Sequence, residues 1–167
     1  MTIPFNADEI LEIAEQIERN GARFYRRAAQ GITDSGTREK LLDLAAMEEE
    51  HQKVFAAIRA DLLPEEREPT IPDPWGEAAL YLRGIADGHV FDVRTDPAGK
   101  LTGKETREDI LRTAIGLEKD SIILYLGMRE IVPERLGKGR IDAIIKEEMS
   151  HIATLSNQLA PSKRSSR

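Results

Sequence analysis

Residues 41–58 read LLDLAAMEEEHQKVFAAI, and residues 141–158 read IDAIIKEEMSHIATLSNQ. In both stretches apolar residues recur every three or four positions, which is the period of an amphipathic α-helix. A Glu-x-x-His sequence lies within the apolar stripe of each, formed by Glu48 with His51 and by Glu148 with His151. An offset of one hundred residues therefore relates two predicted helices with the same ionisable pair on the face that a helical bundle buries.

The same offset relates the two segments that precede these helices. Glu18 and Glu118 each lie within an apolar stripe, thirty residues before the Glu of the following helix. Each is followed seven positions later by a tyrosine, Tyr25 or Tyr125, which is two turns along the same face. The repeat predicts a duplicated helical hairpin with pseudo-twofold symmetry.

Prolines and glycines divide the chain into long helices and connections. We expect one all-α domain over residues 1–161 and a polar tail over 162–167, with four helices at about 6–30, 37–63, 106–131 and 138–160. The proline-rich connection 64–105 is too long for a bare loop, and its apolar spacing around Trp75 and Leu82 predicts a short helix. Two antiparallel hairpins joined by one long crossover form the topology of ferritin-like four-helix bundles.

The composition excludes several classes of chemistry and partner. The 167 residues include no Cys, so disulfides, iron–sulfur clusters and thiolate zinc sites are ruled out. Lys and Arg number 24 against 30 Asp and Glu, and a net charge of −6 argues against nucleic-acid or anionic-membrane partners. The chain has neither a signal-like start nor an apolar run long enough to cross a bilayer, so we expect a cytoplasmic protein.

The ionisable residues of the buried stripes predict a metal centre. Burying four carboxylates without compensation is very unfavourable, and two divalent cations would balance their four negative charges. One Glu from each of two helices and a Glu-x-x-His from each of the other two is the ligand set of di-iron carboxylate bundles. Oxygen and imidazole ligands favour iron or manganese, and zinc can occupy the same ligands. The predicted ligands are Glu18, Glu48, His51, Glu118, Glu148 and His151.

The two stripe tyrosines have two interpretations. Tyr25 and Tyr125 are either ordinary bundle tyrosines or phenols that hydrogen-bond a ligand carboxylate, orient it and help supply an electron.

Four strings resemble the ligand-bearing helices of the rubrerythrin branch of the ferritin-like superfamily: IERNGARFYRRAA, LLDLAAMEEEHQKVF, LEKDSIILYLGM and IIKEEMSHI. The crossover string YLRGIADGHVF resembles the connecting segment of rubrerythrin-like proteins that lack a rubredoxin module. The resemblance implies a non-haem di-iron centre, with two iron ions per chain, that reacts with hydrogen peroxide or dioxygen. It also implies a homodimer or a larger homo-oligomer.

Two departures from the rubrerythrin pattern bear on activity. Peroxide-reducing members carry a further Glu one turn after the ligand of the third helix, where this chain has Ser121. The Cys-rich electron-transfer domain is also missing, so an oxidoreductase reaction needs an external electron donor.

Two alternative functions stay open. Ferritin-like iron oxidation and handling is one alternative, although storage ferritins normally lack the second Glu-x-x-His that ends in His151. A metal-stabilised bundle with a structural or regulatory role is the other.

Overall fold

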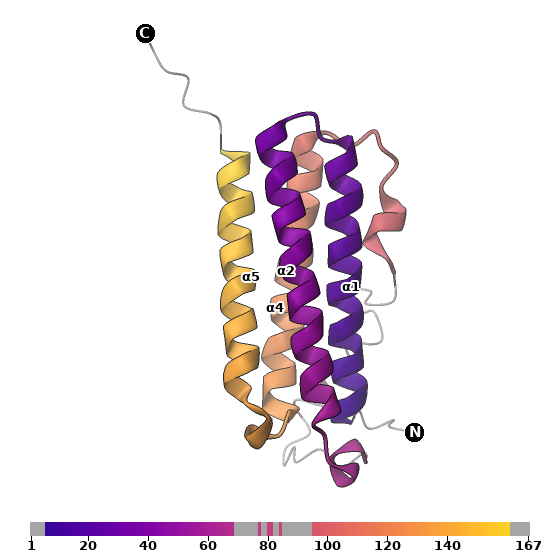
Figure 1. Cartoon of the computed structure of the whole chain (residues 1–167), viewed down its shortest axis with the longest axis vertical. Helices are drawn as coiled ribbons and strands as arrows, with labels where there is room; N and C mark the ends of the chain where they lie inside the picture. The colour runs from indigo at the N-terminus through magenta and orange to yellow at the C-terminus, as the bar shows by residue number, and fades with distance from the viewer. Residues whose placement is uncertain (1–5, 69–76, 78–79, 82–83, 85–94, 161–167) are drawn as a thin grey trace.

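The computed structural model describes residues 6–68, 77, 80, 81, 84 and 95–160. Within these residues there are four long α-helices, which stand side by side, and no strand (Figure 1). The helices are α1 (Ala7–Gly31), α2 (Ser35–Ala60), α4 (Arg107–Ile131) and α5 (Lys138–Leu159). The predicted all-α four-helix bundle is confirmed. None of the described helices is long and apolar enough to cross a membrane.

The directions of the four long helices fit a ferritin-like topology. Figure 1 shows α1 and α5 rising while α2 and α4 descend, so each hairpin is antiparallel and α1 runs antiparallel to α4. α2 ends and α4 begins at opposite ends of the bundle, so the connection between them joins the two ends. The described parts of this crossover include two 3-10 helices, η1 (Pro64–Arg67) and η2 (Pro97–Lys100). Trp75 and Leu82, around which the short helix is predicted, and the predicted tail at 162–167 lie outside the described residues, whereas Glu77, Leu80, Tyr81 and Gly84 are described and helical.

Side-chain caps set where the helices begin. The Asn6 side chain accepts a hydrogen bond from the Glu9 backbone N–H at 2.8 Å. The Glu9 carboxylate in turn accepts one from the Asn6 backbone N–H, which completes a capping box. Asp34 accepts from the backbone N–H of Thr37 at 2.7 Å. Because that cap closes the first turn, α2 begins two residues before the predicted start at Thr37, and it ends earlier than predicted, at Ala60.

The buried apolar residues form two clusters, one toward each end of the bundle. Along every long helix the predicted ligand positions fall between the two clusters. Members of the first cluster include Leu11, Phe55, Leu124 and Ile141. Members of the second include Phe24, Leu41, Leu111 and Leu155. Burying each such side chain contributes roughly 1.5–3 kcal/mol to folding, so two apolar clusters hold a polar layer at mid-height.

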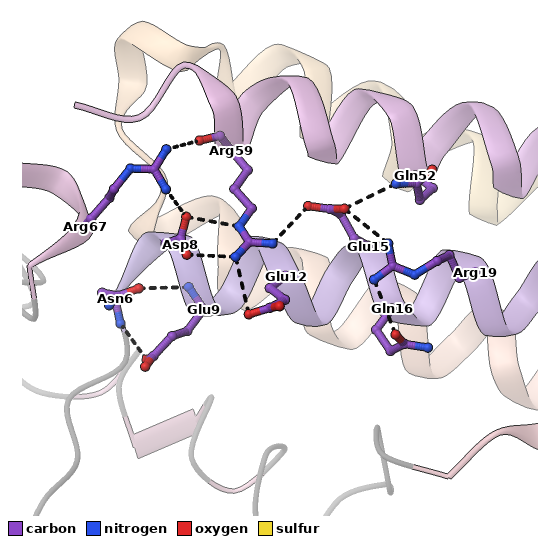
Figure 2. Close-up of polar contacts among 10 residues, drawn as sticks. All are labelled: Asn6, Asp8, Glu9, Glu12, Glu15, Gln16, Arg19, Gln52, Arg59 and Arg67. Carbon is purple, nitrogen blue, oxygen red and sulfur yellow. Dashed lines mark hydrogen bonds and ion pairs between the residues drawn. The ribbon is translucent and has the colours of Figure 1, made fainter. Parts of the chain in front are cut away.

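A partly buried polar network joins the start of α1 to the end of α2 (Figure 2). Arg59 donates from Nε and Nη2 to the two carboxylate oxygens of Asp8, at 3.0 and 2.9 Å. The same guanidinium lies 3.3 Å from Glu12 and 3.5 Å from the buried Glu15. Arg67 of η1 also donates to Asp8, so the beginning of the crossover is tied to the same carboxylate. The hydrogen bond from Arg59 lowers the pKa of Asp8.

Replacing Arg59 with alanine should lower the free energy of unfolding by about 1–3 kcal/mol at pH 7, because Asp8 and Glu15 lose their charged donor. Since the folded-state pKa of Asp8 is lowered, its stabilisation is present above the ordinary Asp value of about 3.9 and is lost as pH falls through the lower folded value. Urea unfolding of wild type and Arg59→Ala from pH 7 to pH 3 measures both effects.

Arg112→Ala is the matched control. Arg112 pairs with Glu108 on the surface of α4, where the two side chains are 67% and 63% exposed. That change should cost no more than about 0.5 kcal/mol. Equal losses in the two variants would show that the Arg59 network adds nothing beyond an exposed ion pair.

Candidate metal centre

The six predicted ligands meet in one buried layer at mid-height of the bundle. Each of them is at most 4% exposed. Their donor atoms form two overlapping groups of four, in each of which the atoms lie within 4.8 Å of one another. One group is Glu18, Glu48, His51 and Glu148, and the other is Glu48, Glu118, Glu148 and His151. Since Glu48 and Glu148 belong to both groups, the layer can hold two adjacent cations that share these two carboxylates.

Both imidazoles turn Nδ1 toward the carboxylates. His51 Nδ1 lies 2.9 Å from Glu148 Oε1 and 3.6 Å from Glu18 Oε2. His151 Nδ1 lies 3.1 Å from Glu148 Oε2 and 3.3 Å from Glu48 Oε1. The two rings stack with their centroids 5.6 Å apart and their planes at 18°. Both histidines therefore present the same nitrogen to the space between the four carboxylates.

Several polar atoms in this layer are buried without a hydrogen bond. Although His51 Nδ1 approaches Glu148 Oε1 closely, the contact lacks the direction of a hydrogen bond. An unsatisfied buried polar atom costs about 1–3 kcal/mol, which a native core seldom tolerates repeatedly in one place. Within the described residues the unsatisfied atoms are Glu18 Oε2, Glu48 Oε1, His51 Nδ1, Glu148 Oε1 and His151 Nε2. Among these atoms the carboxylate oxygens and His51 Nδ1 are suitable ligands for divalent cations.

The electrostatics of the layer favour uptake of positive charge. Burial raises the pKa of Glu18 well above its ordinary value, and the neighbouring Glu48 carboxylate raises it further. Burial likewise raises the pKa of Glu118 to about 8. Burial alone would lower the pKa values of the histidines, but the nearby carboxylates outweigh it and raise them to about 11 for His51 and about 12 for His151. Protons or bound cations can therefore neutralise the same negative charge.

Each stripe tyrosine donates to a carboxylate of the opposite half of the repeat. Tyr25 OH donates to Glu118 Oε1, and Tyr125 OH donates to Glu18 Oε1. Both rings are buried, with at most 1% of their surface exposed. Because α1 packs against α4 in the opposite direction, the phenol of each helix reaches the carboxylate of the other. Each phenol thus orients one carboxylate while leaving its second oxygen free to bind a cation.

A cavity of about 250 Å³ adjoins the layer between α1, α4 and η2. Its lining includes Gly21, Tyr25, Glu48, Glu118 and Ser121. Gly21 and Ser121 are equivalent in the repeat. Glycine has no side chain and serine a small one, so these two positions leave the space open. A Cβ at Gly21 would lie 3.1 Å from Glu48 Oε2, so glycine here makes room for the shared carboxylate. A small molecule that enters the cavity can therefore reach the shared carboxylate of Glu48.

One contact to the layer does not follow from the stripe pattern. Glu147 Oε2 lies 2.6 Å from Nε2 of His51, on the side of the ring that faces away from the other carboxylates. Glu147 precedes Glu148 on α5 and lies off the buried stripe, with its side chain 52% exposed. The repeat does not point to it, since the equivalent residue one hundred positions earlier is Met47.

No protein-family model matches the chain, and no curated protein matches it. Among solved structures the chain is similar to the crystal structure of a Thermotoga maritima protein described as a ferritin-like diiron-carboxylate protein. The two chains are 24% identical with a TM-score of 0.66, and the alignment covers 98% of this chain and 97% of the other. The similarity shows that the bundle has the ferritin-like fold, which the long crossover predicts.

Unfolding in the presence of EDTA should depend on pH in one direction. Because the folded-state pKa of Glu118 is raised to about 8, its stabilising effect is complete below the ordinary Glu value of about 4.3 and is lost as pH rises through 8. The raised pKa values of Glu18 and the two histidines act in the same direction. Thermal melts in EDTA should therefore show a higher midpoint at pH 5 than at pH 8.

Glu118→Gln supplies the control for that dependence, since it removes the titrating group and keeps its shape. Its melting midpoint should fall less between pH 5 and pH 8 than that of wild type. A wild-type midpoint that stays constant or rises with pH would contradict the electrostatic account of the layer.

Proposed function

We propose that this protein is a rubrerythrin-type di-iron oxidoreductase that reacts with hydrogen peroxide or dioxygen and receives electrons from an external donor. The observation that carries the proposal is the pair of overlapping four-ligand groups, which share Glu48 and Glu148 in a fully buried layer. The resemblance of the four ligand-bearing strings to rubrerythrins and the ferritin-like fold support it.

The donor set of the layer fits two divalent cations. Four carboxylates carry four negative charges, and two neutral imidazoles add none, so two divalent ions bring the net charge to zero. Unpartnered carboxylate oxygens and His51 Nδ1 already lie within this buried layer. Oxygen-rich ligands with imidazole favour iron or manganese, and zinc can bind the same ligands in a preparation.

The residues divide into three roles. Glu18 with His51 would hold one ion, Glu118 with His151 would hold the other, and the two shared carboxylates would contact both. When bound, a pair of iron ions supplies two electrons to an oxidant and afterwards takes two electrons from the donor.

The surrounding side chains control access and orientation. Tyr25 and Tyr125 hold the carboxylates of Glu118 and Glu18 in place through their phenol hydroxyls. The apolar clusters above and below the layer exclude bulk water from it. The cavity beside Gly21 and Ser121 is large enough for small oxidants such as peroxide or dioxygen.

The cellular setting is part of the same proposal. A chain without cysteines cannot carry a thiolate-bound electron relay of its own, so the donor is a second molecule. We propose that the protein acts in the cytoplasm as a homodimer or larger homo-oligomer, as its resemblance to rubrerythrins implies.

Ferritin-like iron oxidation is a second candidate function, favoured by one observation. Ser121, which lines the cavity, stands where peroxide-reducing rubrerythrins carry a further Glu. Its hydroxyl donates to the Leu117 carbonyl at 3.1 Å and so is used within its own helix. A layer without that additional carboxylate is also suited to oxidising iron with dioxygen.

Rapid mixing of anaerobically iron-loaded protein with each oxidant tests the proposed function. Oxidation by peroxide should be at least about tenfold faster than oxidation by dioxygen, which corresponds to an activation free energy about 1.4 kcal/mol lower. The absorbance of ferric iron at stopped-flow times provides the rate. Glu48→Gln should abolish the fast phase, whereas Glu49→Gln, at a half-exposed neighbouring position, should retain it.

Two results of that experiment would overturn the proposal. A faster reaction with dioxygen, followed by growth of a ferric mineral, supports ferritin-like iron handling instead. Inertness to both oxidants supports a bundle in which the metal is structural or regulatory.

Gly21→Ala should weaken metal binding while stabilising the metal-free fold. The new methyl group meets Glu48 Oε2 at 3.1 Å and must displace this shared carboxylate, for which we expect about a tenfold loss of Mn²⁺ affinity. Alanine also favours the helix over glycine by up to about 1 kcal/mol. Gly116→Ala in α4 is the control, because no atom lies within 4 Å of its added Cβ. Isothermal titration with Mn²⁺ and melts in EDTA separate the two effects, and equal Mn²⁺ affinities in the two variants would refute the packing argument.

A further inference from the structure

The pseudo-twofold symmetry of the layer breaks at the outer nitrogens of the two histidines. His51 Nε2 meets the Glu147 carboxylate at 2.6 Å. The equivalent nitrogen of His151 is buried and has no hydrogen-bond partner within the described part of the chain. The residue that corresponds to Glu147 in the first half of the repeat is Met47, whose side chain has no oxygen to accept a hydrogen bond from an imidazole N–H. The two imidazoles are therefore held differently although their own sequence motifs are the same.

The remaining contacts of the two four-ligand groups are balanced. Each group contains one histidine, one carboxylate of its own and the two shared carboxylates. Each unshared carboxylate also accepts one hydrogen bond from a buried tyrosine of the opposite half. Glu147 consequently supplies one group with a hydrogen bond that the other group lacks.

The missing acceptor matters because an imidazole that binds a cation through Nδ1 must carry its proton on Nε2. At His51 the Glu147 carboxylate accepts a hydrogen bond from Nε2–H. This hydrogen bond fixes the ring plane and increases the electron density at Nδ1. At His151 the same tautomer would bury an N–H without an acceptor, which opposes cation binding.

We propose that the two cation positions of the layer are unequal, and that Glu147 makes the position at Glu18 and His51 the tighter one. Glu147 acts as a positioning residue, since it touches the ligand His51 and not the cation. The inference rests on the proposed function only in requiring that the layer bind divalent cations. It predicts an order of filling, with the His51 position occupied first.

Variants that leave one histidine test the inequality directly. Mn²⁺ is suitable because it does not require anaerobic handling, and its free ion gives an electron paramagnetic resonance signal that disappears on binding. His151→Ala retains the His51 position, and His51→Ala retains the His151 position. We expect His151→Ala to bind Mn²⁺ about 10- to 100-fold more tightly than His51→Ala, the usual effect of an outer carboxylate on a metal-binding histidine.

Adding Glu147→Ala to each background assigns the difference to this carboxylate. Affinity should fall about 10- to 100-fold in the His151→Ala background and stay unchanged in the His51→Ala background. Glu147→Gln should retain most of the affinity, because its amide oxygen still accepts from Nε2. Glu50→Ala is the control for loss of a nearby surface charge, since the Glu50 side chain is 69% exposed and pairs with Lys53. Met47→Glu in the His51→Ala background should restore part of the missing affinity.

Measurements on the intact layer cover the case in which the histidine variants bind no ion. Glu147→Ala in the otherwise wild-type chain should then weaken the tighter of the two binding steps, and Glu50→Ala should not. If Glu147→Ala has the same effect as Glu50→Ala, or weakens both backgrounds equally, the inequality is refuted while the metal centre stands. If the wild-type chain takes up no Mn²⁺, the proposed function fails and the inference fails with it.

Discussion

Four carboxylates buried in one layer of the core impose the constraint on which this structure depends. Removing them from water is costly, and the two imidazoles beside them can offset that cost only by taking up protons. Burial and mutual repulsion raise the pKa values of Glu18 and Glu118, so the layer collects positive charge from its surroundings. Two divalent cations answer the same need without protons, and they also use the unpartnered oxygen and nitrogen atoms. The apolar clusters on either side supply the folding free energy that keeps such a layer in place.

The duplicated hairpin gives the layer its geometry. Antiparallel packing of α1 on α4 lets each tyrosine hydroxyl reach the carboxylate of the other half, so the two halves orient one another. Glu48 and Glu148, which belong to both four-residue groups, come from α2 and α5, and the two groups together therefore draw on all four helices. Exact symmetry is not kept, since Gly21 faces Ser121 across the cavity and Met47 replaces the acid that Glu147 provides. The first difference bears on access to the layer and the second on how firmly a histidine is held.

Much of this arrangement is predictable because helical periodicity determines which residues a bundle buries. The apolar spacing around residues such as Glu18 and His51 predicts the helices and their buried faces. Together with the hundred-residue repeat and the positions of the prolines, it also predicts a ferritin-like crossover and a layer of six ionisable residues. Other features depend on contacts between helices that periodicity does not specify. The pairing of Tyr25 with Glu118 follows from helix direction and axial register, and the early start of α2 follows from one side-chain cap at Asp34. Glu147 lies off the buried stripe, so only the three-dimensional approach of α5 to α2 reveals its contact with His51.

The central claim is that the buried layer holds two divalent cations side by side. Anomalous diffraction at the iron absorption edge, from crystals of protein loaded anaerobically with Fe²⁺, tests it most directly. The account predicts two anomalous peaks within the layer, one beside Glu18 and His51 and one beside Glu118 and His151, with Glu48 and Glu148 in contact with both. Iron found only on the surface, or a layer that stays free of iron while its carboxylates are protonated, would contradict it.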